Sequence, residues 1–162
     1  MINQISITNK QIEKAKNLSE ELGKLKNSIT DGGHNIYGFL GELIVAEYLN
    51  TEQKNTYDYD MKLPSGLTID VKTKRCTSTP SPNYECSIAA YNTKQKCDVY
   101  VFTRILDNMK VGWILGYKTK EEYFKEANFL KQGQIDPSNN YTVKADCYNL
   151  KIKNLHSIEN LK

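Results

Sequence analysis

Residues 57–75 read YDYDMKLPSGLTIDVKTKR, and apolar and polar side chains alternate on both sides of the Pro-Ser-Gly segment at 64–66. A period of two is typical of half-buried β-strands, and a segment with Pro and Gly between two such runs indicates a turn. The stretch therefore predicts a β-hairpin with one polar face.

The polar face of this hairpin brings acidic side chains together. With the turn centred on Ser65, Asp60 lies opposite Asp70 and Asp58 lies opposite Lys72. Like charges directly opposite each other destabilise a sheet unless they share a proton or a cation. Mg²⁺ prefers oxygen ligands and would fit between the two carboxylates. Lys72 shares the face of Asp70, where an ammonium can orient an attacking water or stabilise charge on a phosphate.

The apolar segment before the hairpin supplies a third carboxylate. Residues 35–49 are apolar on nearly all sides, which predicts a helix in the interior of the fold. Glu42 has mostly apolar neighbours three and four positions away, and a carboxylate in such surroundings needs a partner. Packing against the hairpin would bring Glu42 to the aspartates, with Gly38 and Gly41 permitting a close approach.

The remaining segments predict a mixed chain of helices and strands, of the α/β or α+β class, as one domain over residues 1–162. A capping-box pattern at Thr8 and Gln11 opens a helix that runs toward two glycines, so residues 1–33 form a helical extension. The other predicted elements are strands near 87–91, at 98–106 and at 111–117, a helix from a second capping box at Thr119 and Glu122 to about Leu130, and one or two strands after Asn139.

Composition narrows the function only slightly. The chain has 162 residues, 39% of them apolar, and a net charge of +3, which neither demands nor forbids a polyanionic partner. Arg75 and Arg104 are the only arginines, which limits bidentate recognition. The N-terminus lacks an apolar signal region, the longest apolar stretch is too short to span a bilayer, and the four cysteines lack zinc-site spacing. A cytoplasmic protein without membrane contact is expected, in the host cytoplasm if the chain is viral.

The acidic residues and the lysine, taken together, resemble the PD-(D/E)XK nuclease superfamily. Glu42 on a helix, Asp60 on one strand and Asp70-Val71-Lys72 on the next follow its pattern, although Tyr59 stands where proline is usual. The later segments KCDVYVFTRIL, VGWILGYKTKEEYFKEANFL and YTVKADCYNLKIKNL look like successive blocks of small phage-type nucleases of this group. The resemblance implies the restriction-endonuclease-like αβββαβ core, with a mixed central sheet flanked by helices.

The resemblance also implies an activity and a set of site residues. The chain is expected to be a Mg²⁺-dependent deoxyribonuclease, with Mn²⁺ able to substitute, acting on DNA as a monomer or homodimer with structure-based or low sequence specificity. The implied roles are metal binding by Asp60, Asp70, the Val71 carbonyl and Glu42, and catalysis by Lys72 together with these acids. Apart from the resemblance, Lys74 and Arg75 are expected to contact phosphates, and a plain surface lysine is the alternative for Lys74.

Several alternatives stay open at this point. Asp58 shares the face of Asp60 and competes with it as the first metal ligand. Glu42 is also consistent with a buried carboxylate paired to a lysine. The acids and lysines of the hairpin are also consistent with a solvated face that neutralises itself. In that case the chain is a non-catalytic module that binds nucleic acid or protein.

Overall fold

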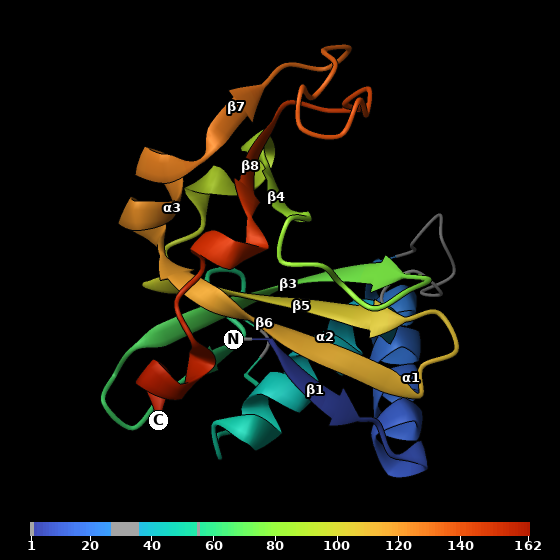
Figure 1. Ribbon diagram of the computed structural model, residues 1–162. Coiled ribbons are helices and arrows are strands. Elements are labelled where there is room, and N and C mark those ends of the chain that lie inside the picture. The colour runs from blue at the N-terminus through green and yellow to red at the C-terminus, as the bar shows by residue number, and fades with distance from the viewer. Residues whose placement is uncertain (1, 27–35, 55) are drawn as a thin grey trace.

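The central sheet contains five strands, and the computed structural model describes residues 2–26, 36–54 and 56–162 (Figure 1). The strands are β1 (Asn3–Ser6), β2 (Met61–Lys62), β3 (Thr68–Cys76), β5 (Val99–Leu106) and β6 (Val111–Thr119). Their order across the sheet is β1-β6-β5-β3-β2. β3 and β5 run parallel, whereas the other neighbouring pairs run antiparallel, so the sheet is mixed as predicted.

A second sheet of three strands lies above the central one in Figure 1. It consists of β4 (Glu85–Ala89), β7 (Asn128–Leu130) and β8 (Cys147–Lys151), in the order β4-β8-β7 with antiparallel pairing. Helix α3 (Lys120–Glu126) lies next to it. The described residues also form three short 3₁₀ segments: η1 (Ala90–Lys94), η2 (Ile152–Asn154) and η3 (Ile158–Leu161), the last of which contacts β6 of the central sheet.

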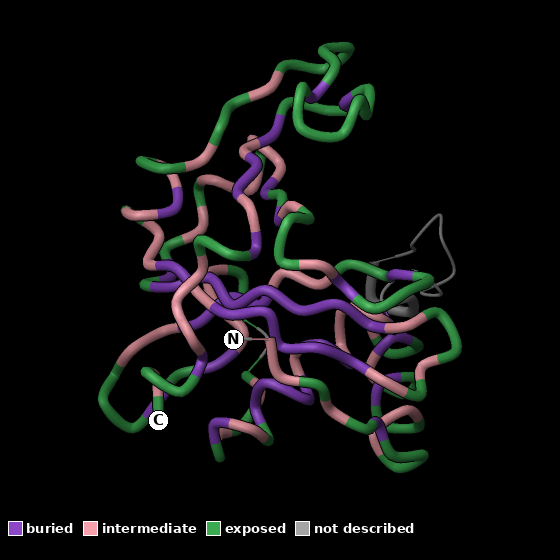
Figure 2. Tube along the Cα trace, in the orientation of Figure 1, coloured by how far each residue is buried: buried purple, intermediate pink, exposed green. Residues whose placement is uncertain are grey.

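Helices α1 (Asn9–Lys26) and α2 (Ile36–Tyr48) pack against each other, and α2 covers one face of the central sheet. That face and α2 share a core that includes Leu40, Ile44, Ile69 and Val71. The opposite face packs against the second sheet and α3, through a core with Tyr100, Phe102, Trp113 and Tyr123. Both faces of the central sheet are therefore covered, and Figure 2 shows its central strands as the most buried part of the chain.

Close packing of α2 on the sheet depends on Gly41. A Cβ at this position would collide with the hydroxyl groups of Thr73 and Thr103, whose oxygens lie 2.8 Å apart. Gly38 faces open space, because no atom outside its own helix lies within 4 Å of the point that a Cβ would occupy. The prediction of a close approach is therefore confirmed for Gly41 and wrong for Gly38.

Local signals predict the starts of the helices well. Thr8 and Gln11 exchange side-chain to backbone hydrogen bonds before α1, and Thr119 and Glu122 do the same before α3. The predicted helix at 35–49 corresponds to α2. The expected end of the first helix, near two glycines, lies outside the described residues. All four cysteines are buried and free.

Three predictions about extent are wrong. The first strand of the hairpin covers only Met61–Lys62, because residues 57–60 form bends and irregular structure instead of a strand. The helix that starts at Lys120 ends at Glu126 instead of near Leu130, because residues 128–130 pair with β8. The strand β1 is absent from the sequence-based prediction, and it pairs with β6 at the edge of the sheet.

The structure agrees with the expected αβββαβ core only in having a mixed sheet and helices. From α2 onward the order is α2-β2-β3-β4-η1-β5, so a 3₁₀ segment occupies the position of the second helix. β4 pairs with β8 in the second sheet rather than in the central one. Within the part of the chain that the structure describes, no helix has the length and apolar character needed to cross a membrane.

Candidate functional site

The predicted register of the hairpin is confirmed next to its turn. Met61 pairs with Ile69 and Lys62 with Thr68. One residue earlier, the backbone N–H of Asp60 donates to the carbonyl of Ile69 at 2.8 Å. This carbonyl belongs to the register partner of Met61, so the regular pairing ends at Met61 and the strands do not pair Asp60 with Asp70 as predicted. The two aspartates still lie close enough for their charges to interact.

The carboxylate of Asp60 is fixed against β3. Its Oδ2 accepts a hydrogen bond from the backbone N–H of Val71 at 2.7 Å. In an extended strand the N–H and C=O of one residue point to the same side. The Val71 carbonyl therefore points toward the same edge of β3 as the Asp60 carboxylate, where the expected metal ligands would meet.

Asp70 and Lys72 form an ion pair along β3. Asp70 is 4% exposed, and Lys72 Nζ lies 2.7 Å from its Oδ2. Asp70 Oδ2 is buried. Apart from this ion pair, it has no hydrogen-bond partner among the described residues. The ammonium of Lys72 also lies 5.7 Å from the centroid of the Tyr100 ring.

Gln95 connects these two side chains, and the sequence gives no sign of it. Its Oε1 accepts from Lys72 Nζ at 2.9 Å, and its Nε2 donates to Asp70 Oδ1 and to the Tyr57 carbonyl, both at 3.2 Å. The Gln95 carbonyl in turn accepts a hydrogen bond from Lys120 Nζ. Gln95 follows η1 and belongs to no recognisable sequence motif. Its place in the site depends on the path of the chain between β3 and β5.

Glu42 reaches the aspartates from α2. Its Oε2 accepts a hydrogen bond from Gln53 Nε2, and its carboxyl group is hydrogen-bonded to Asp60. Burial, and then the charge of Asp60, raises the pKa of Glu42 to about 8. A protonated Glu42 can donate to the Asp60 carboxylate, so the two groups share a proton.

Burial also raises the pKa values of the two aspartates. The pKa of Asp60 is raised to about 7, first by burial and then by the charge of Asp70. Burial raises the pKa of Asp70, although the ammonium of Lys72 opposes this shift. The elevated pKa values mean that the negative charge of these three carboxyl groups is not fully compensated in the folded protein. A bound cation would compensate it.

The donor set fits a hard divalent cation. The described side chains include no preformed group of three His, Cys, Asp or Glu residues around a metal position. Mg²⁺ does not require one, because it commonly binds through one or two carboxylates and keeps several waters. Asp60, Asp70 and the Val71 carbonyl supply such ligands.

The other predicted site residues lie apart from this cluster. Asp58 Oδ1 accepts a hydrogen bond from the backbone of Lys96 at 3.1 Å, so Asp60, and not Asp58, contacts Val71. The expected pairing of Asp58 with Lys72 is absent because residues 57–60 do not form a strand. Alternation along β3 places Lys74 and Arg75 on opposite faces of the strand, and Arg75 lies 5.1 Å from the ring centroid of Tyr37.

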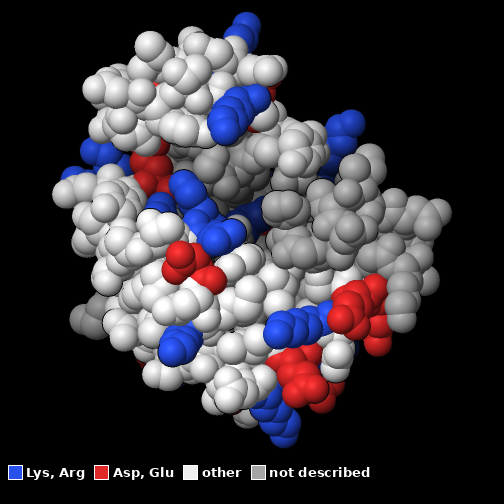
Figure 3. All heavy atoms as spheres, turned by 90° about the vertical axis from the view of Figure 1, so that its right-hand side faces the viewer, with Lys and Arg blue, Asp and Glu red and all other residues white. Residues whose placement is uncertain are grey.

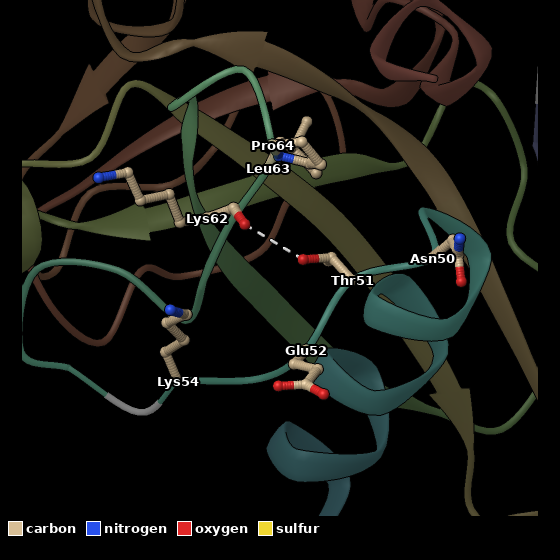
Figure 4. Close-up of a pocket in the computed structure, with 7 residues that line it drawn as sticks. All are labelled: Asn50, Thr51, Glu52, Lys54, Lys62, Leu63 and Pro64. Atoms are coloured by element: carbon tan, nitrogen blue, oxygen red, sulfur yellow. Dashed lines mark hydrogen bonds between the residues drawn. The ribbon is translucent and has the colours of Figure 1, made fainter.

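A shallow pocket near the hairpin turn contains none of these side chains. Figure 4 shows its lining, which consists of Asn50, Thr51, Glu52, Lys54, Lys62, Leu63 and Pro64. Thr51 Oγ1 donates to the Lys62 carbonyl at 3.1 Å and joins the two segments that form the pocket. One carboxylate between two lysines gives this pocket no recognisable chemistry.

Comparison with protein-family models finds no match to this chain, and comparison with curated proteins also finds none. A function therefore has to be argued from the side chains and their geometry.

Proposed function

We propose that this protein is a Mg²⁺-dependent deoxyribonuclease that hydrolyses phosphodiester bonds of DNA. One observation carries the proposal: Glu42, Asp60, Asp70 and Lys72 come from three separate segments and gather at one edge of β3. Three acids and a lysine at the edge of a sheet are a chemically sufficient set for metal-assisted hydrolysis of a phosphate ester.

Asp60, Asp70 and the carbonyl of Val71 would hold the cation, with Glu42 as a further ligand, direct or through water. When bound, Mg²⁺ supplies positive charge that stabilises the negative charge developing on the phosphoryl oxygens. Mn²⁺ has similar ligand preferences and is expected to substitute.

Lys72 is the residue that would act on the water and the phosphate. Its ammonium group has three protons, and it donates two of them to Asp70 and Gln95. The third remains for an attacking water or a phosphoryl oxygen. Because Asp70 and Gln95 fix the ammonium in place, Lys72 would meet the substrate without a large loss of side-chain entropy.

The two arginines argue for low sequence specificity. Specific reading of base edges commonly uses the bidentate guanidinium group. Arg75 is placed over the ring of Tyr37, and Arg104 is 7% exposed. Neither is free to read bases, which favours selection by DNA structure over selection by sequence.

The test is cleavage of supercoiled, linear, single-stranded and branched DNA in the presence of Mg²⁺. Asp70→Asn and Lys72→Met should abolish cleavage while preserving the circular dichroism spectrum of the folded protein. Asp107→Asn, which changes an exposed carboxylate in the β5–β6 turn, serves as the matched control. Cleavage at the normal rate by both site variants would refute the proposal.

A non-catalytic binding module is the second candidate, and the ion pair between Asp70 and Lys72 favours it. That pair neutralises part of the hairpin face without any metal. Titration with Mn²⁺ or Ca²⁺ distinguishes the two candidates, because a ligand that binds only the folded protein raises the melting temperature. An unchanged melting temperature at millimolar metal would support the non-catalytic module.

A further inference from the structure

Lys74 and Arg104 are neighbours on the two parallel strands of the central sheet. They are register partners on β3 and β5. Side chains at alternate positions of a strand share one face, so Asp70, Lys72 and Lys74 follow one another along β3. At about 3.3 Å per residue, Lys74 lies roughly 7 Å beyond Lys72. This distance is comparable to the spacing of successive phosphates on one nucleic-acid strand.

Arg104 is a buried cation without an acidic partner. It is 7% exposed, its Nη2 donates to the Glu85 carbonyl at 3.1 Å, and its guanidinium lies 5.3 Å from the ring centroid of Tyr84. Among the residues that the structure describes, the ion pairs within 4.0 Å involve neither Arg104 nor Lys74. A buried charge of this kind is costly unless an opposite charge joins it.

The nearest carboxyl group does not neutralise the pair. Glu85 directs its Oε1 to the hydroxyl of Ser138, which donates to it at 2.8 Å. Burial raises the pKa of Glu85, and a hydrogen bond with Asp136 raises it further. Among the described residues, no ion pair within 4.0 Å joins Glu85 to Lys74 or Arg104.

The two side chains differ in their exposure, because Lys74 is exposed and Arg104 is buried. Burial, followed by the charge of Arg104, lowers the pKa of Lys74, so the two cations repel each other across the strands. Figure 3 shows Lys and Arg side chains gathered in the hollow between the upper part of the molecule and the part below it. An anion that approaches from solvent would meet the exposed Lys74 before the buried Arg104.

We propose that Lys74 and Arg104 form an anion site that binds a backbone phosphate of nucleic acid, one nucleotide away from the phosphate held at Asp70 and Lys72. The position of the site relative to cleavage rests on the proposed nuclease function, but its affinity for anions does not. The sequence predicts phosphate binding by Lys74 and Arg75. The structure instead pairs Lys74 with Arg104, because Arg75 points to the opposite face.

The first experiment measures anion binding without any catalysis. Melting temperatures are compared in sodium sulfate and sodium chloride at equal ionic strength. At sulfate concentrations of about ten times Kd, the wild-type protein should gain roughly 3 to 6 °C. Lys74→Met and Arg104→Met should lose this gain, whereas Lys74→Arg should keep it because the charge remains.

The matched control is Lys14→Met, which removes one positive charge from an exposed position of α1. It should gain as much from sulfate as the wild-type protein. Because Arg104 is buried, its replacement is a risk to folding, and if Arg104→Met does not fold, the exposed Lys74 decides the result alone. Equal gains in wild type, Lys74→Met and Lys14→Met would overturn the anion site.

The second experiment identifies the source of the phosphate. A fluorescent DNA oligonucleotide and its uncharged methylphosphonate analogue are titrated in EDTA. Lys74→Met should weaken binding of the DNA about tenfold, the effect of one lost charge-assisted contact, and should leave binding of the analogue unchanged. A variant that loses the sulfate response but binds DNA normally would restrict the site to free anions and overturn the nucleic-acid assignment.

The two proposals fail independently. Asp70→Asn should lose cleavage but keep the sulfate gain that depends on Lys74. If no cleavage of DNA is found while that gain is present, the nuclease proposal fails and the anion site stands. If cleavage depends on Asp70 but sulfate has no effect that depends on Lys74, the anion site fails and the nuclease proposal stands.

Discussion

Asp60 Oδ2 accepts a hydrogen bond from the backbone N–H of Val71 at 2.7 Å, and this contact connects the two halves of the candidate site. It holds the first aspartate beside the strand that carries the second aspartate and the lysine. Because β2 contains only two residues, this side-chain contact continues the hairpin where strand pairing has ended.

Replacing Asp60 should separate metal binding from folding. Asp60→Asn keeps an oxygen that can accept from Val71 but removes the negative charge, so we expect a folded protein that has lost its affinity for Mn²⁺. Isothermal titration calorimetry measures the affinity, and Asp58→Asn tests the rival ligand. Loss of Mn²⁺ binding in Asp58→Asn but not in Asp60→Asn would reverse the assignment of the first ligand.

The stability of the metal-free protein should fall as pH rises from 5 to 8. The pKa of Glu42 is raised to about 8 and that of Asp60 to about 7, both above their ordinary values of 4.5 and 3.8. Between these limits the folded protein binds more protons than the unfolded chain. The free energy of unfolding therefore decreases with increasing pH. Urea unfolding at several pH values measures it.

Glu42→Gln is the informative variant for this pH dependence. An uncharged amide removes the titrating group, so the decrease in unfolding free energy between pH 5 and 8 should be smaller than in the wild-type protein. Saturating Mg²⁺ should offset the decrease as well, because a cation favours the ionised carboxylates. A slope with the same value in Glu42→Gln and in wild type would contradict the assigned cause.

Gln95 should matter for the rate of cleavage more than for substrate affinity. Gln95→Ala removes the contacts that orient Lys72 and Asp70, and we expect kcat to fall about 10- to 100-fold with little change in KM. Steady-state kinetics on a DNA substrate measure both constants. A purely structural role would lower the melting temperature and leave kcat of the folded fraction unchanged. That pattern would exclude positioning by Gln95.

The two glycines of α2 should respond in opposite ways to alanine. Gly41→Ala places a methyl group against the hydroxyls of Thr73 and Thr103, and overpacking of this kind costs about 1 to 3 kcal/mol of unfolding free energy. Gly38→Ala adds a methyl group in open space and should be neutral or stabilise the helix by up to about 1 kcal/mol. Chemical denaturation of both variants gives the comparison, and equal effects would contradict it.

Short-range signals in the sequence are reliable in this protein. The alternation around the Pro-Ser-Gly turn predicts the register that pairs Met61 with Ile69, and the capping boxes at Thr8 and Thr119 predict where two helices begin. Each of these depends on residues within a few positions of one another. The physical cause is local: hydrogen-bond geometry, the pleat of a strand and the conformations that a turn permits.

Contacts between distant segments have no such local signal. Gln95 joins Lys72 and Asp70 from the crossover between β3 and β5, and Arg104 meets Lys74 only because those two strands pair in parallel. β1 lacks a clear pattern of its own and becomes a strand by pairing with β6.

By itself, the sequence determined the acids and the lysine of the candidate site and the register of the hairpin next to its turn, because a hairpin is a local structure. Only the tertiary structure decided which side chains surround them: Glu42 hydrogen-bonded to Asp60, Gln95 on Lys72, and Arg104 beside Lys74. These partners depend on how α2 and β5 pack against β3. That packing follows from burial of apolar surface across the whole chain, which no short stretch of sequence specifies.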